Sequence, residues 1–193
     1  MLIYLHGFRS GPQSYKAQSL RARMEHLGLG QAYWCEQLAW SPLAAIDQVT
    51  RVIERCTTPP TLVGSSLGGH YATALAERFG LRAVLVNPSV ISHITLEPFL
   101  GRQTMIYTGE EFDVRREYLD EMRALDVDRL QDPTRYWLMV ETGDELLDWR
   151  LAVARYDGAR QTVLPGGDHS FTRWDDYLDD ILRFAGLLPE HAA

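Results

Sequence analysis

The sequence predicts an α/β fold, in which a mostly parallel sheet is covered by helices on both faces. Apolar runs of strand length alternate with longer amphipathic segments about six times along the 193 residues. Glycine, proline and asparagine separate these segments, as expected at the ends of strands and helices. Parallel strands need crossover connections, and helices supply them here, so the alternation favours one sheet. A chain of this length is typical of one domain with a sizeable core.

Six strands are expected, each an apolar or β-branched run that ends at a turn signal. The first, for example, runs into the loop HGFRSGP. The six cover Leu2 to Leu5, Gln31 to Cys35, Thr61 to Val63, Arg82 to Val86, Tyr136 to Glu141, and Arg160 to Leu164.

Helices are expected in most of the intervals, because apolar residues recur there at helical spacing. Ser41 is predicted to be an N-cap, with Pro42 at the first helical position. Four apolar residues of that helix are predicted to face inward: Leu43, Ile46, Val49 and Ile53. The other helices cover Ser14 to Leu27, Leu67 to Phe79, Asp148 to Tyr156, and Trp174 to Leu187.

The interval 88–135 is unusual, because about fifty residues separate the fourth strand from the fifth. Inside it, Glu111 to Arg129 is predicted to be a charged helix with a narrow apolar stripe of Leu119, Met122 and Leu125. Two interpretations remain open. The segment either covers the edge of the sheet or forms a small lid or wall of a substrate cleft. In both, residues 1–193 form one domain.

The composition argues against several classes of partner. The net charge is −7 and no stretch is densely basic, which disfavours nucleic acid and anionic membrane surfaces. The apolar run at the start is too short for a signal segment or a membrane span. Cys35 and Cys56 form no close-spaced pair, which indicates reduced thiols. We therefore expect a cytoplasmic protein that acts on a small molecule, with no prediction of its oligomeric state.

Residues 62–72, LVGSSLGGHYA, carry the motif G-x-S-x-G between a predicted strand and a predicted helix. Its third position is Ser66. We expect side chains at Gly64 and Gly68 to collide with the neighbouring strand and helix. Free N–H groups at the start of a helix can hold an oxyanion, and here the N–H of Leu67 is expected to do so. The context favours Ser66 over Ser65 as a nucleophile.

A serine hydroxyl needs a base, which in α/β-hydrolases follows it along the chain as a histidine. Three histidines follow the helix after Ser66: His93, His169 and His191. His169 is preferred because LPGGDHSF lies directly after the last predicted strand.

The base needs an orienting acid from the end of the preceding strand. The stretch WLMVETGDELLD offers Asp144, Glu145 and Asp148. Asp144 is preferred because it follows Gly143 at the strand end, whereas Asp148 fits the first turn of a helix. Asp168 adjoins the histidine in sequence, and neighbouring loop residues usually point apart.

A second oxyanion donor is expected in HGFRSG, where Gly7 lets the backbone approach the substrate and Phe8 presents its N–H. His6 is expected to brace this loop, and His70 to pack or to form a hydrogen bond. No metal-ligand spacing is present, and no metal or cofactor is expected.

The chain resembles the YqiA-like esterases, small members of the α/β-hydrolase superfamily. The resemblance rests on the segments IYLHGFRSGPQSYKA, LVGSSLGGHYATALAE, VLVNPSV, YTGEEFDV, ETGDELLDWRLAVARY and LPGGDHSFTRW. It implies a triad of Ser66, Asp144 and His169, and hydrolysis of carboxylic esters, including thioesters. It also implies a compact three-layer fold of about six parallel strands, without the superfamily's first two strands and without a large cap domain.

The leading functional hypothesis is therefore a serine esterase that cleaves short- to medium-chain esters through an acyl-enzyme. An alternative keeps the triad in a thioesterase or an acyltransferase. A third is a hydrolase-like binding module without catalysis, which the complete triad disfavours.

Overall fold

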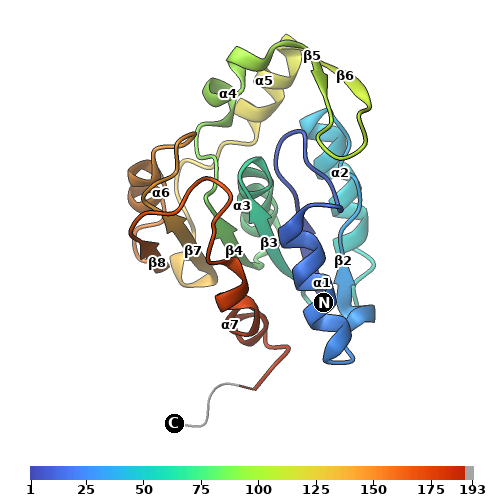
Figure 1. Ribbon diagram of the computed structural model, residues 1–193, viewed down its shortest axis with the longest axis vertical. Coiled ribbons are helices and arrows are strands. Elements are labelled where there is room, and N and C mark those ends of the chain that lie inside the picture. Colours follow the sequence, from blue (N-terminus) through green and yellow to red (C-terminus); the bar gives the residue numbers. More distant parts are fainter. Residues whose placement is uncertain (190–193) are drawn as a thin grey trace.

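The computed structural model describes residues 1–189 and contains a six-stranded parallel sheet (Figure 1). The strand order is β2-β1-β3-β4-β7-β8, and every pairing in this sheet is parallel. The predicted fold class is confirmed. The strands are β1 (Leu2–Leu5), β2 (Tyr33–Trp34), β3 (Thr61–Ser65), β4 (Arg82–Val86), β7 (Tyr136–Glu141) and β8 (Arg160–Leu164).

Helices cover both faces of the sheet, which makes three layers (Figure 1). Leu2 and Tyr4 of β1 pack toward α1 and α7, whereas Ile3 and Leu5 pack toward α2 and α3. The central strands are continuous apolar runs because both of their faces are buried. The helices are α1 (Tyr15–His26), α2 (Pro42–Ile53), α3 (Leu67–Phe79), α6 (Trp149–Arg155) and α7 (Leu178–Phe184).

The start of α2 follows the predicted cap. The Ser41 side chain accepts a hydrogen bond from the N–H of Ala44, and Pro42 is the first helical residue. The prediction that Leu43 faces inward is wrong, because its side chain is 44% exposed. Ala45 takes the buried place one turn before Val49.

Every helix within residues 1–189 is too short or too polar to cross a membrane.

The interval 88–135 differs from its prediction. It contains α4 (Ser92–Thr95), an antiparallel hairpin of β5 (Gly101–Thr104) and β6 (Glu111–Val114), and α5 (Arg116–Ala124). The predicted helix from Glu111 to Arg129 is therefore wrong at its start. Phe112 and Val114 are buried while Glu111 and Asp113 are exposed, an alternation that fits a strand rather than a helix. The hairpin projects beyond the sheet at the top of Figure 1.

Candidate active site

Ser66 lies at a sharp turn between β3 and α3. Its backbone has φ 55° and ψ −120°, a conformation that non-glycine residues rarely adopt. The turn is possible because its neighbours are glycines. A Cβ on Gly64 would lie 2.3 Å from the carbonyl oxygen of Gly68, and one on Gly68 would lie 2.0 Å from that of Leu5. The predicted collisions at both glycines are thus confirmed, with α3 in the first case and β1 in the second.

Three of the predicted residues come together above the ends of the strands. The Ser66 hydroxyl oxygen lies 3.0 Å from Nε2 of His169, and Nδ1 of His169 lies 2.8 Å from Oδ2 of Asp144. The serine follows β3, the aspartate follows β7 and the histidine follows β8. The Asp144 side chain is almost fully buried, so this interaction is shielded from water.

The second carboxylate oxygen of Asp144 accepts hydrogen bonds from the N–H groups of Leu146 and Leu147. These bonds orient Asp144 toward His169. Asp148 lies elsewhere, as the N-cap of α6, where it accepts from the N–H of Arg150.

The other rejected candidates lie apart from Ser66 as well. The carboxylate of Asp168 accepts hydrogen bonds from the N–H and the hydroxyl of Ser170. Nδ1 of His93 lies 3.0 Å from Oδ2 of Asp126, and His191 lies outside the described residues.

Glu141, at the end of β7, is a site residue that the sequence did not reveal. Its carboxylate is 0% exposed and accepts hydrogen bonds from the N–H groups of Asp168 and Thr172, the Thr172 hydroxyl and the Arg173 guanidinium. Burial raises the pKa of Glu141, but the hydrogen bonds outweigh burial and hold the pKa below its usual value. Gly167 has φ +71°, and a Cβ there would lie 1.8 Å from the same carboxylate.

Asn87, at the end of β4, holds the same loop from the other side. Its amide nitrogen donates to the carbonyl oxygens of Asp168 and His169, and its amide oxygen accepts from the N–H of Glu141. Asn87 is buried and has φ 41°. Together, Asn87 and Glu141 tie the loop that carries His169 to β4 and β7.

The loop after β1 lies against the serine. A Cβ on Gly7 would lie 3.2 Å from that of Ser66, so the glycine permits this close approach. His6 braces the loop, as predicted: its Nε2 accepts from the N–H of Leu38, so Nδ1 carries the proton and donates to the carbonyl oxygen of Gly7. Burial lowers the pKa of His6, which favours this neutral form.

His70 lies in the first turn of α3, and its Nε2 donates a hydrogen bond to the carbonyl oxygen of Met122 at 3.1 Å. Since a carbonyl oxygen only accepts, the ring nitrogen is the donor. The expected hydrogen-bonding role is thus confirmed, and it joins α3 to α5.

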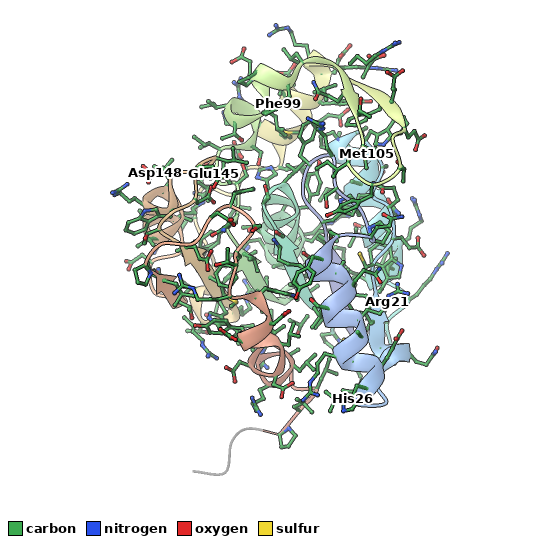
Figure 2. The ribbon with its side chains drawn as sticks, viewed as in Figure 1. Arg21, His26, Phe99, Met105, Glu145 and Asp148 are labelled. Atoms are coloured by element: carbon green, nitrogen blue, oxygen red, sulfur yellow. The ribbon has the colours of Figure 1, made fainter. Side chains whose placement is uncertain are left out.

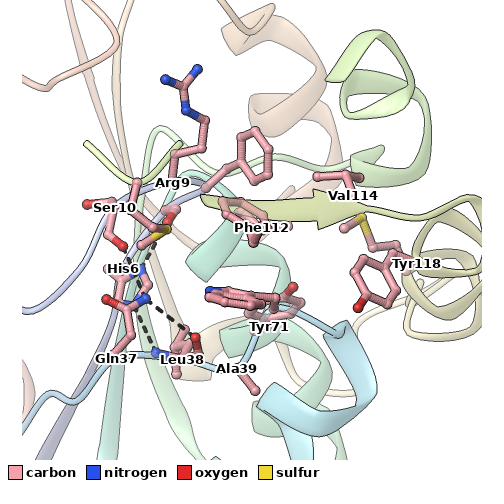
Figure 3. A pocket seen from close by; sticks show the side chains of 16 residues that line it. His6, Arg9, Ser10, Gln37, Leu38, Ala39, Tyr71, Phe112, Val114 and Tyr118 are labelled. Atoms are coloured by element: carbon pink, nitrogen blue, oxygen red, sulfur yellow. Dashed lines mark hydrogen bonds between the residues drawn. The ribbon is translucent and has the colours of Figure 1, made fainter. Parts of the chain in front are cut away.

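An apolar cavity lies beneath the β5–β6 hairpin (Figure 3), and its lining includes Leu67, which follows Ser66, and Gly7, which lies against Ser66. Phe8 makes edge contacts with Phe99 and Phe112, and Trp40 stacks on Phe112 with ring centroids 5.2 Å apart. Arg9 ties the hairpin to the loop after β1, because its Nε donates to the Thr104 carbonyl at 2.8 Å. The cavity is lined mainly by the apolar side chains of Phe8, Leu38, Trp40, Leu67, Tyr71, Met105, Phe112, Val114 and Met122.

A second, wider cleft contains Ser66 and His169 themselves. Lys16 and Ser14, from the start of α1, lie on one of its walls. Glu145, which is labelled with Asp148 in Figure 2, also lines the cleft and accepts a hydrogen bond from the N–H of His169. Within residues 1–189, no three His, Cys, Asp or Glu side chains are grouped so that they could hold a metal ion.

Solved structures with this fold include proteins of low sequence identity. A protein from Agrobacterium vitis S4 that is assigned as a hydrolase is 21% identical, with a TM-score of 0.72 over 95% of this chain and 87% of that one. The mouse alpha/beta hydrolase domain-containing protein 10 is 17% identical, with a TM-score of 0.68 over 94% and 89%. A monoacylglycerol lipase from Paleococcus ferrophilus is 14% identical, with a TM-score of 0.67 over 97% and 94%. These likenesses show that the chain has the α/β-hydrolase fold.

The family is established by the sequence itself. The family described as uncharacterised protein family UPF0227 matches residues 1–186, which is nearly the whole chain. The resemblance to the YqiA-like family is thereby confirmed. The chain belongs to the UPF0227 family, and it has the α/β-hydrolase fold.

Proposed function

We propose that the protein is a serine hydrolase that cleaves carboxylic esters or thioesters with short- to medium-length acyl groups through an acyl-enzyme. The observation that carries this proposal is the continuous contact from Asp144 through His169 to Ser66, with the serine on a strained turn. A fold kept only for binding has no need of this arrangement. The complete triad therefore supports catalysis.

In this mechanism, Nε2 of His169 accepts the proton of Ser66 as the oxygen attacks the substrate carbonyl. Asp144 accepts the hydrogen bond from Nδ1–H, which fixes the tautomer and stabilises the imidazolium. His169 then gives the proton to the departing alcohol or thiol, and water later cleaves the acyl-enzyme by the same route.

The oxyanion would be held by the N–H groups of Leu67 and Phe8. Leu67 is the first residue of α3, so its N–H has no acceptor within the helix and lies at the positive end of the helix dipole. Phe8 follows Gly7, whose backbone lies against Ser66.

The acyl group is expected to enter the apolar cavity. The side chains of Phe8 and Leu67 line that cavity, and their N–H groups face the carbonyl oxygen in this mechanism. Burial of each additional CH₂ is worth roughly 0.8 kcal/mol only while space remains. We expect kcat/KM for p-nitrophenyl esters to rise with acyl length and then level off, and a steady rise to sixteen carbons would contradict this expectation.

The test is hydrolysis of p-nitrophenyl butyrate by the wild type, Ser66→Ala and Ser65→Ala. Loss of the nucleophile should lower kcat on the order of 10⁶-fold, whereas Ser65→Ala should keep kcat within about tenfold. Circular dichroism establishes that each variant is folded. Near-wild-type activity in folded Ser66→Ala would overturn the proposal.

A further inference from the structure

Lys16 places a positive charge in the cleft beside the serine. It is the second residue of α1, it is half-buried, and it lines the same cleft as Ser66 and His169. Its ammonium group donates to the carbonyl oxygen of Ser170, directly after His169. In the part of the chain that the structure describes, no carboxylate oxygen lies within 4.0 Å of this ammonium group.

An ammonium group in this position is unfavourable without an anion. Burial lowers the pKa of Lys16 to about 8, although the carboxylates of Asp168, Glu141 and Asp144 raise it. Those three carboxylates are engaged elsewhere, with Ser170, the loop after Gly167, and His169 respectively. Partly buried charges in proteins usually have a partner of opposite charge in direct contact. Among the described residues Lys16 has no such contact, so its environment favours the binding of an anion.

Ser14 adds a second unsatisfied group on the same wall. Ser14 is 8% exposed and lines the cleft together with Tyr4, whose hydroxyl interacts with that of Ser14. The Ser14 hydroxyl makes no hydrogen bond of normal geometry within residues 1–189. Ser14 is also the N-cap of α1, although its hydroxyl caps no N–H of that helix. A twelve-residue helix presents free N–H groups and a positive dipole end there, which favour an anion.

The chemistry of the proposed reaction places this wall on the side of the leaving group. His169 must donate its proton to the departing oxygen or sulfur, so the leaving group lies next to the imidazole. Lys16 bonds to the residue that follows His169, whereas the apolar cavity lies on the side of Phe8 and Leu67. The acyl and leaving groups would thus extend into different surroundings, one apolar and one cationic.

We propose that Lys16, Ser14 and the amino end of α1 form a binding subsite for an anionic group on the leaving alcohol or thiol. This inference rests on the proposed function. It narrows the substrate class to esters or thioesters whose leaving group carries a carboxylate or a phosphate. Glu145 also lines the cleft, where its carboxylate accepts from the N–H of His169 and disfavours an anion beside that residue.

The test compares matched aryl esters that differ in charge. The anionic substrates are 3- and 4-carboxyphenyl butyrate, and the neutral controls are 3- and 4-carbamoylphenyl butyrate. For the wild type, kcat/KM should be higher for the anionic member of at least one pair. Lys16→Gln should lower this preference by about tenfold or more, mainly through KM, while Lys16→Arg should keep it. Ser14→Ala should lower it less.

The neutral esters separate the possible failures. An equal loss for both substrates in Lys16→Gln would mean that Lys16 only supports the loop of His169 through Ser170, and it would overturn the subsite. An unchanged preference would overturn it too. If the wild type cleaved no ester, the proposed function would fail, and calorimetric binding of 4-hydroxybenzoate against 4-hydroxybenzamide would still test the subsite. Equal affinity for the two in that measurement would overturn it.

Discussion

Glu141→Gln tests whether the buried carboxylate positions the histidine. One oxygen of Glu141 accepts from the N–H groups of Asp168 and Thr172 at 3.0 and 2.9 Å, and the other accepts from the Arg173 Nε and the Thr172 hydroxyl at 3.0 and 2.9 Å. In Glu141→Gln, an N–H₂ group, which donates hydrogen bonds, replaces one of these two accepting oxygens. At least one pair of donors then faces an N–H₂ group and loses its acceptor.

Each buried donor without an acceptor costs about 1–3 kcal/mol. Arg173 is 34% exposed and can turn to water, so the amide should face Arg173 and the cost should lie at the lower end. We expect the free energy of unfolding to fall by about 2–4 kcal/mol. Because Asp168 and Thr172 flank His169, a loop shift of about 1 Å should lower kcat by about 10²-fold with little change in KM.

The assay is urea unfolding followed by tryptophan fluorescence, together with kcat and KM for p-nitrophenyl butyrate. Glu77→Gln is the matched control. Glu77 is also buried, with an 8% exposed side chain, and accepts from the Tyr136 hydroxyl, Arg135 and the N–H of Gln131, away from the cleft. It should lose stability but keep kcat. A normal kcat in Glu141→Gln, or an equal loss in Glu77→Gln, would refute the reasoning.

Three further predictions concern the triad acid, the turn and the cleft. Asp144→Asn should lower kcat by about 10⁴-fold by leaving the imidazole in the wrong tautomer, as in the serine-protease precedent. Asp148→Asn should lower kcat by less than about tenfold. Steady-state kinetics of the two variants test this difference. Gly68→Ala should cost about 3 kcal/mol or more, because its Cβ would meet a carbonyl oxygen of β1 at 2.0 Å, and an unchanged melting temperature would contradict this packing. The preference for anionic esters should be present below the Lys16 pKa of about 8. It should fade as the pH rises through that value, because the amine loses its proton. A preference that is constant from pH 6.5 to 9.5 would exclude Lys16 as its source.

Most of the sheet was predictable because its central strands are buried on both faces. Arg82 to Val86 and Tyr136 to Glu141 have the predicted bounds, since each is a mainly apolar run that ends just before Asn-Pro or Thr-Gly. Arg160 to Leu164 also has its predicted bounds, although none of its residues is fully buried, and Pro165-Gly166 marks its end. The β5–β6 hairpin was missed because EFDV is too short for its alternation to stand out beside a charged helix.

The approach of Asp144, His169 and Ser66 to one another was predictable because each residue follows a strand end, where motif and topology agree. Glu141 and Asn87 were missed because their roles depend on contacts with a loop that lies far away along the chain. A weak signal was present: Glu141 ends an otherwise apolar run, YWLMVE, and a charge at a buried strand end needs partners. No pattern in the sequence indicated that Lys16 would lie beside His169, because that proximity depends on how α1 packs.

The central claim is that Ser66 is an activated nucleophile. Treatment with a fluorophosphonate, followed by intact-mass measurement and peptide mapping, tests it directly. We expect one phosphonyl group per chain, located on Ser66 and absent from Ser66→Ala. Labelling should also be much slower in Asp144→Asn, because His169 is then poorly oriented. A folded wild-type protein that stays unlabelled, or one labelled at another residue, would contradict the account.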